Sequence, residues 1–175
     1  MEKLESGTRW RLEQKELVSF FNPAYGGALE ELDTVPKSVN LMCNLQRRKE
    51  AYHEAVLNKL GKPSDPDKPL SIHELLGSKE EHLDQHLFYD KNRRLSFVDH
   101  FFKEALAPEE FARSSYHEVG DFVGKPYHAE MQTRRSVKEL CFERKGSLTF
   151  HEKKYPVTVR KIISPKGPAS FKVHY

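Results

Sequence analysis

Hydrophobic and polar residues alternate at the two ends of the chain, and the middle follows a different pattern. Residues 10–21 (WRLEQKELVSFF) alternate loosely, which predicts one or two short strands, and residues 28–32 predict another. The alternation returns near residue 127 and predicts strands over residues 127–134, 137–144, 147–154, 157–163 and 170–175. Gly146-Ser147 and residues 165–168 (PKGP) supply turn residues between them. The chain is therefore predicted to be mainly β, with residues 127–175 forming a β-meander.

The middle of the chain predicts short helices and loops between these two groups of strands. Residues 40–45 fit a strand or a tight turn, and residues 47–60 fit a helix that Gly61 ends. Residues 61–71 contain three prolines and predict a surface loop. Residues 72–87 fit a short helix or irregular chain, with Ser78 and Glu81 at capping-box spacing. Residues 95–107 carry five apolar side chains at helical spacing and predict a helix packed on the core, and Pro108 begins a further helical turn.

Composition narrows the class of protein. At 175 residues the chain has the size of one domain, so residues 1–175 are treated as one. Only 37% of the residues are hydrophobic and the mean hydropathy is −0.74, so a large share of the chain must be surface. There is no run of about 18 apolar residues, which excludes a membrane-spanning helix, and the start (MEKLESGTRW) is too charged for a secretory signal. Cys43 and Cys141 lie far apart in unlike contexts, which predicts reduced thiols and a cytoplasmic location.

Charge is unevenly distributed. The net charge is +3, and the last 50 residues contain 11 Lys and Arg against 4 Asp and Glu. A basic region is one feature of nucleic-acid-binding proteins. Here the charges alternate with apolar residues, as on the solvent face of a sheet, so nucleic-acid binding is the less favoured prediction.

The candidates for catalytic and metal chemistry are weak. Of nine histidines, only His82 and His86 have i,i+4 spacing on a predicted helix, and HEHLDQH lacks the HExxH arrangement of a zinc protease. We predict no metal site and no cofactor. The sequence has no G-x-S-x-G elbow, P-loop or dinucleotide fingerprint. Glu31 and Asp33 alternate onto one strand face and could stand about 5 Å apart, the separation of a retaining glycosidase pair.

Two segments rich in glycine, aromatic and charged residues lie close together in the first third of the chain. Residues 22–33 (NPAYGGALEELD) place Gly26 and Gly27 between an apolar run and a carboxylate-rich one, where a glycine pair serves a tight turn or positive φ. Residues 47–53 (RRKEAYH) predict a structural polar cluster of Arg47, Arg48, Glu50 and His53, which is favoured over contact with a sugar. If the two segments meet, its arginines would pair with carboxylates such as Glu31 or Asp33.

Aromatic side chains are the candidates for contact with a sugar. Trp10, Tyr25, Tyr52, Tyr89 and Tyr127 either fill the core or present a face to a ligand, and core packing is the more favoured interpretation. Tyr25, directly before the glycines, is the one that we place near a ligand-facing edge.

These segments, followed by SIHELL (residues 71–76), LFYDKNRRLSFVDHFF (residues 87–102) and EVGDFVGKPY (residues 118–127), stand in an order that is informative as a whole. From about residue 17 to residue 127 the chain resembles the C-terminal region of the family-57 glycoside hydrolases, the α-amylase and 4-α-glucanotransferase group. The resemblance implies a partial supersandwich of the galactose-mutarotase-like kind with short helical insertions. It also implies that the catalytic carboxylates belong to a barrel outside this region, so no residue here is predicted to be catalytic, and that the chain is truncated at both ends.

The function implied by the resemblance is that of an accessory C-terminal domain of an enzyme acting on α-1,4-glucans, with the barrel as its partner in cis or as a separate chain. Two alternatives stay open: a stand-alone, non-catalytic carbohydrate-binding module, and a nucleic-acid binder that uses the basic C-terminal strands. The candidate residues for contact with glucan or with the barrel are Tyr25, Gly26, Gly27, Glu31, Asp33, Arg47, Arg48, Tyr52 and His53.

Overall fold

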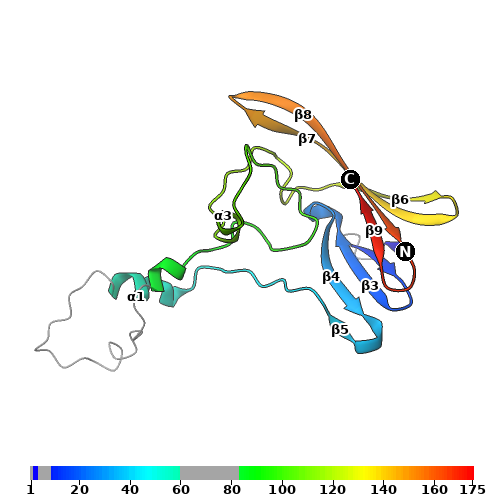
Figure 1. Ribbon diagram of the computed structural model, residues 1–175, viewed down its shortest axis with the longest axis horizontal. Coiled ribbons are helices and arrows are strands. Elements are labelled where there is room, and N and C mark those ends of the chain that lie inside the picture. Colours follow the sequence, from blue (N-terminus) through cyan, green and yellow to red (C-terminus); the bar gives the residue numbers. More distant parts are fainter. Residues whose placement is uncertain (1, 4–8, 60–82) are drawn as a thin grey trace, which may run out of the picture.

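Two antiparallel β-sheets form the body of the molecule (Figure 1). The computed structural model describes residues 2–3, 9–59 and 83–175. Within these residues the first sheet has the order β1-β2-β3-β4-β5 and the second has the order β6-β7-β8-β9. The strands of the first sheet are β1 (Glu2–Lys3), β2 (Trp10–Glu13), β3 (Leu17–Asn22), β4 (Ala28–Thr34) and β5 (Val39–Asn40). Those of the second are β6 (His128–Arg134), β7 (Val137–Phe150), β8 (Lys153–Pro165) and β9 (Phe171–His174).

The hydrophobic core lies between these two sheets. In β3 burial alternates strictly, so that Leu17, Ser19 and Phe21 point inward. The ring of Phe21 packs against that of Phe142 on β7, with 6.0 Å between the ring centroids. The buried cluster combines Trp10, Leu12, Phe21 and Leu29 of the first sheet with Leu140, Phe142 and Ile163 of the second, and Phe122 and Tyr127 complete it. The prediction of a mainly β fold with short helical insertions is confirmed.

The turn predicted at Gly146-Ser147 is wrong, because β7 continues through it as one strand from Val137 to Phe150. A Cβ on Gly146 would lie 2.7 Å from Cζ of Phe122 and closer still to Asp121. Glycine is therefore needed there for close packing and not for a change of direction. The chain turns instead at His151 and Glu152, both of which have positive φ (46° and 65°), the conformation of a two-residue hairpin loop. The predicted strands over residues 137–144, 147–154 and 157–163 are thus two long strands, β7 and β8.

The helix predicted over residues 95–107 is also wrong. Phe97 has a φ of 65°, which no right-handed helix allows, and Ser96 forms an isolated antiparallel bridge with Leu29. The apolar side chains in this stretch go to different neighbours: Phe97 lies near Phe171 and Phe101 packs on Phe122, with ring centroids 6.2 Å and 4.9 Å apart respectively. The apolar residues in this stretch have helical spacing, but they pack in different directions and do not form one face of a helix.

The described helices are short; two of them connect strands of the first sheet, and three lie between the two groups of strands. They are η1 (Pro23–Tyr25), η2 (Val35–Lys37), α1 (Ala51–Lys59), η3 (Leu83–His86) and α3 (Pro108–Ala112). The helix predicted over residues 47–60 begins only at Ala51, the brief turn predicted at Pro108 is confirmed, and β5 ends at Asn40 with irregular chain after it. The predicted loop over residues 61–71, the capping box at Ser78 and His82 lie outside the described residues.

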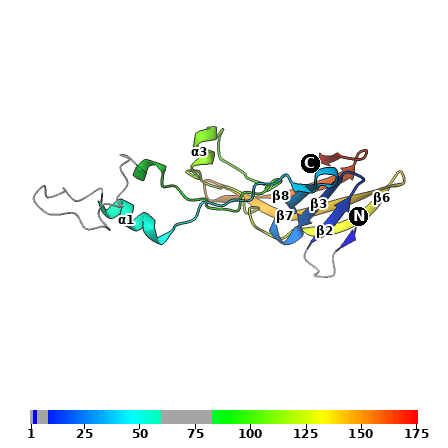
Figure 2. The same ribbon diagram turned by 90° about the horizontal axis from the view of Figure 1, so that it is seen from below.

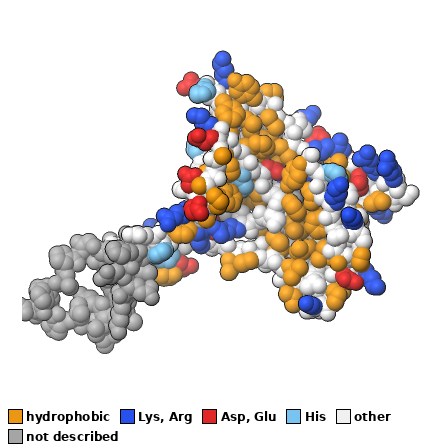
Figure 3. All heavy atoms as spheres, in the orientation of Figure 1, with side chains coloured by type: hydrophobic (Ala, Val, Ile, Leu, Met, Phe, Trp, Pro, Cys, Tyr) orange, Lys and Arg blue, Asp and Glu red, His pale blue; other side chains and the backbone are white. Residues whose placement is uncertain are grey.

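A long projection leaves the body between the two groups of strands. We call residues 41–59 and 83–95 the arm; they run out from β5 to α1 and return through η3 toward α3 (Figure 1). A view turned by 90° shows the same projection away from the two sheets (Figure 2). On the body itself, hydrophobic side chains form a band along the β7–β8 hairpin and over the first sheet (Figure 3).

Candidate functional site

The glycine turn at the start of β4 is a fixed point of the fold. Asn22 caps η1 by accepting a hydrogen bond of 2.9 Å from the backbone N–H of Ala24. Gly26 and Gly27 follow with φ of 73° and 64°, so the prediction that this pair serves positive φ is confirmed. A Cβ on Gly27 would also lie 2.7 Å from Cγ of Phe142, whereas one on Gly26 would meet nothing within 4 Å. The chain thus needs glycine at position 27 for two reasons.

A buried ammonium group lies directly below this turn. The side chain of Lys161 on β8 is fully buried, and its Nζ donates to the carbonyl of Gly26 (2.6 Å) and to that of Phe97. Its ion-pair partner is Asp99, with 2.7 Å between Nζ and Oδ2, and the hydroxyl of Tyr127 donates to the same carboxylate oxygen. The ammonium therefore joins the glycine turn, the Phe97–Asp99 stretch and the second sheet.

Burial shifts the pKa of both Lys161 and Tyr127 in this centre. Burial lowers the pKa of Lys161, and the hydrogen bond and charge of Asp99 act in the opposite direction. Burial raises the pKa of Tyr127, and its hydrogen bond to Asp99 raises it further, so the phenol stays a hydrogen-bond donor. Sequence reasoning missed this centre. The available signal was Lys161 at an inward position of the alternation, between Val159 and Ile163.

Glu30 on β4 forms a second polar centre beside the turn. Its carboxylate is 5% exposed and contacts Arg9 Nε (3.0 Å), Arg93 Nη1 (2.7 Å) and Asn22 Nδ2 (3.0 Å). Burial alone would raise the pKa of Glu30, but the hydrogen bonds from Asn22 and Arg93 and the charges of both arginines outweigh it and lower the pKa. Tyr25 belongs to this centre, because its hydroxyl accepts the backbone N–H of Arg93 at 3.2 Å.

Asp90 is the anchor of a third centre, at the base of the arm. It is 2% exposed and accepts the backbone N–H of Arg47 (2.7 Å), the Nε of Arg47 (3.0 Å) and the Nε of Arg94 (3.0 Å). Burial favours the neutral acid, but these hydrogen bonds and the charge of Arg94 are stronger and lower the pKa of Asp90 to about 2. The guanidinium of Arg47 also lies 4.1 Å from the centroid of the Phe88 ring.

The predicted pairing of Arg47 or Arg48 with Glu31 or Asp33 is wrong. Arg47 pairs with Asp90, and among the residues that the structure describes the exposed Arg48 contacts Gln46 (3.3 Å). Glu31 and Asp33 lie side by side on β4, where burial, then the neighbouring Asp33, raises the pKa of Glu31. The arginines cannot reach β4 because the chain after β5 carries them outward along the arm.

A fourth centre joins His100 to Glu118. His100 Nδ1 and Glu118 Oε1 are 2.5 Å apart, and Oε2 of Glu118 accepts the backbone N–H of Phe101 at 3.1 Å. The rings of Phe111 and Tyr116 meet the imidazole edge to face, with centroids 5.3 Å and 5.8 Å away. These rings border a hollow of about 520 Å³, which also contacts Met42, Asn92 and Arg94.

The structure thus distributes the candidate residues over separate places. Tyr25, Gly26 and Gly27 lie at the turn, Glu31 and Asp33 on β4, and Arg47, Arg48, Tyr52 and His53 on the arm. His53 accepts the backbone N–H of Glu50 at its Nδ1 (3.1 Å), and the hydroxyl of Tyr89 lies 3.1 Å from the same atom. Among the other aromatic candidates, Trp10 and Tyr127 are buried in the core, as the favoured interpretation predicted.

Three of the four centres are structural ion pairs, and the fourth is a hydrogen-bonded pair of His100 and Glu118. Within the described ranges, Glu30, Asp90 and Asp99 are each held by Lys or Arg, which keeps them as hydrogen-bond acceptors. No group of three or more His, Cys, Asp or Glu side chains that could hold a metal occurs in the part of the chain that the structure describes. Nor does any helix described here have the length and apolar character needed to cross a membrane.

The fold and these centres define a β-sandwich domain whose buried charges hold irregular chain against its sheets. Residues 8–175 match the family described as "Alpha-amylase/4-alpha-glucanotransferase, C-terminal". The chain therefore belongs to this family of C-terminal domains, as the resemblance implied.

Named relatives agree with this assignment. The chain is 34% identical to a 4-alpha-glucanotransferase of Thermococcus litoralis over 152 residues, covering 87% of this chain and 22% of the relative. It is 33% identical to an alpha-amylase of Pyrococcus furiosus over 120 residues, covering 69% of this chain and 18% of the relative. The crystal structure of the Thermococcus litoralis 4-alpha-glucanotransferase superimposes with a TM-score of 0.68 at 30% identity, over 90% of this chain and 22% of that one. The chain spans about a fifth of the length of these relatives.

Proposed function

We propose that this chain is the accessory C-terminal domain of a family-57 α-amylase or 4-α-glucanotransferase that acts on α-1,4-glucans in carbohydrate metabolism. Its role there is to support the catalytic barrel. The observation that carries the proposal is the family match over residues 8–175, together with relatives of which the chain covers only 22%. The remainder of such an enzyme supplies the chemistry, in cis or as a separate chain.

The state of the carboxylates supports an accessory role. A glycosidase acid needs a raised pKa so that it carries a proton at neutral pH. Asp90 and Glu30 have lowered pKa values because arginines bind them. Burial and the neighbouring Asp33 raise the pKa of Glu31, so this carboxyl group needs a separate test as a catalytic acid. Glu31→Gln provides that test. We expect the purified chain to release no glucose or maltose from starch. Activity that survives repurification and disappears in Glu31→Gln would contradict this.

The proposal is tested by exchanging domains. The matching region of the Thermococcus litoralis 4-alpha-glucanotransferase is deleted in one protein and replaced by this chain in a second. If the chain is an accessory domain of this enzyme class, the chimera transfers glucan units and the deletion protein loses activity or stability. A chimera no more active and no more stable than the deletion protein would refute the proposal.

Contact with glucan is a finer proposal. Tyr52 on the arm is 63% exposed and Phe111 beside the hollow is 45% exposed, so both present aromatic surface of the kind on which sugars stack. Affinity electrophoresis in glycogen or amylose measures this directly. Retardation of the isolated chain would favour the stand-alone carbohydrate-binding module as the second candidate function.

A cytoplasmic location is proposed from the cysteines. Both Cys43 and Cys141 are free thiols, and Cys43 is exposed, which suits a reducing compartment. Thiol labelling of the protein in intact and lysed cells, together with fractionation, tests this location.

A further inference from the structure

The arm carries apolar side chains that are exposed to solvent. Leu41 is 58%, Leu45 79%, Tyr52 63% and Leu57 47% exposed. Residues 41–50 have no regular secondary structure, and none of the described side chains from residue 41 to residue 59 is buried. Apolar side chains gathered on a projecting segment and bordered by charged ones are typical of a surface that contacts another protein.

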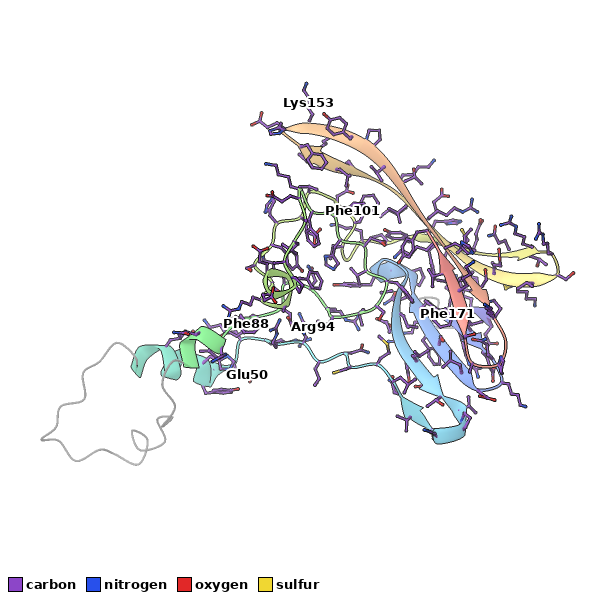
Figure 4. The ribbon with its side chains drawn as sticks, in the orientation of Figure 1. Glu50, Phe88, Arg94, Phe101, Lys153 and Phe171 are labelled. Carbon is purple, nitrogen blue, oxygen red and sulfur yellow. The ribbon has the colours of Figure 1, made fainter. Side chains whose placement is uncertain are left out.

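The arm is nevertheless held in a defined direction. Asp90 on the returning segment of the arm accepts hydrogen bonds from the backbone and side chain of Arg47 on the outgoing segment, and the N–H of Asp90 donates to the carbonyl of Arg47 at 3.0 Å. Arg47 and Arg94 both donate to the carbonyl of Ala112, the last residue of α3, which fixes the base of the arm to the body. Figure 4 shows Arg94 nearest the body, with Phe88 and Glu50 farther out along the arm. A preorganised arm loses less conformational entropy on binding than a flexible one.

The occupant follows from the length of the relatives. The family match includes the whole arm, and the matched region makes up 22% of the Thermococcus litoralis relative, so most of that polypeptide lies outside it. The backbone N–H of Leu41 still donates to the carbonyl of Leu32 on β4, and beyond Asn44 the arm projects away from both sheets (Figures 1 and 2). In such a relative, the remaining part of the polypeptide is the candidate to cover the exposed side chains of the arm.

We propose that the arm, through Leu41, Leu45, Tyr52 and Leu57, is the element that docks this domain onto the catalytic part of the enzyme. The proposal rests on the proposed function and specifies its partner surface. The ion-pair centre at Asp90 sets the angle of the arm, and the apolar side chains supply the contact.

The chimera with the Thermococcus litoralis 4-alpha-glucanotransferase provides the test. One variant carries Leu41→Glu and Leu45→Glu on the arm. The matched control carries Met131→Glu and Val137→Glu, which are 42% and 39% exposed on the β6–β7 hairpin. Differential scanning calorimetry records whether the two parts of each chimera unfold together. Each pair is also placed in the isolated chain, where we expect the melting temperature to change by less than about 2 °C because exposed positions tolerate substitution.

The expected result is one unfolding transition for the unchanged chimera and for the control, and two transitions for the arm variant. The proposal is overturned if the arm variant still unfolds in one transition, if the control pair separates the transitions equally, or if the unchanged chimera already shows two. It is also overturned if the isolated chain forms a dimer in analytical ultracentrifugation that the arm substitutions abolish, since a second copy would then be the occupant. If the unchanged chimera transfers glucan while its arm variant unfolds in the same way as the control variant, the proposed function stays intact and the docking role of the arm is refuted.

Discussion

Removing the partner of the buried ammonium should be among the most damaging single changes in this chain. Asp99→Asn keeps the size of the side chain and an acceptor oxygen for the hydroxyl of Tyr127, but it removes the charge that lies 2.7 Å from Nζ of Lys161. Lys161 is fully buried, so its ammonium cannot turn to water. Its remaining partners would be the carbonyls of Gly26 and Phe97, which are neutral dipoles.

The magnitude follows from the burial of both charges. Breaking a buried ion pair by removing one member costs about 3–5 kcal/mol, because the other charge stays uncompensated. For a chain of this size each kcal/mol lowers the melting temperature by about 2–4 °C, so the variant should melt roughly 6–20 °C lower. Lys161→Met leaves the carboxylate of Asp99, 8% exposed, without its cation and should also be costly. The double variant should lose less than the sum of the two, because it leaves neither charge behind.

Urea denaturation of the four proteins, followed by circular dichroism, measures this cycle, and its pH dependence gives a second check. The pKa of Lys161 is lowered in the folded state, so above that pKa and below about 10.5 the unfolded chain binds more protons and stability rises with pH. Asp99 raises the pKa of Lys161, so removing its charge lowers that pKa further, and the stability of Asp99→Asn starts to rise at a lower pH than that of the parent. The loss in Asp99→Asn should therefore shrink between pH 7 and pH 10. A variant within about 0.5 kcal/mol of the parent at pH 7 would show that the charge is not confined as described.

Three further predictions concern the glycine turn and the arm. Gly26→Ala should cost about 1 kcal/mol for its positive φ, and Gly27→Ala should cost about 1–3 kcal/mol more because its Cβ would meet Phe142; equal melting temperatures for the two variants would contradict this order. Arg47→Ala should destabilise the chain and increase hydrogen exchange at the base of the arm, whereas Arg48→Ala, with one weak contact, should behave like the parent; the same protection in both would refute the assignment. Asp90 has a pKa of about 2 against 3.8 in the unfolded chain, so its contribution to stability is complete above pH 4 and is lost as the pH falls toward 2. Asp90→Asn should remove this part of the acid dependence, and an unchanged acid-unfolding curve would exclude it.

The sheets were predictable from the sequence because alternation is a local signal. β3, the second half of β8, and β9 alternate between more buried and more exposed positions, and the pattern located them. The ends of β7 and β8 were not predictable, because His151 and Glu152 adopt positive φ without glycine, while Gly146 lies inside a strand for reasons of packing. Local pattern reports periodicity well and reports the φ of a non-glycine residue poorly.

The polar centres lay beyond local pattern for a different reason. Arg93 and Glu30 are 63 residues apart in the sequence, Lys161 and Phe97 are 64 apart, and Arg47 and Asp90 are 43 apart. Several carboxylates in the sequence could have paired with Arg47, and the path of the arm determines that its partner is Asp90 and not Asp33. The resemblance to the family predicted the fold, whereas the pairing of charges depends on the three-dimensional path of the chain.

The stretch from residue 88 to residue 102 has one isolated bridge and no helix or strand, yet it carries Asp90, Arg93, Arg94, Asp99 and His100, which serve four different centres. A strand tolerates many side chains because its backbone ladder specifies where it goes. In a stretch without such a ladder, the path of the backbone depends on the order of its side chains, because each one pairs with a partner at a different place. Deleting or inserting one residue here would move every later charge away from its partner. The same fact explains why this stretch reads as a motif in the sequence although none of its charges is assigned to catalysis: a recognisable fingerprint can record how a chain finds its path as well as what an enzyme does.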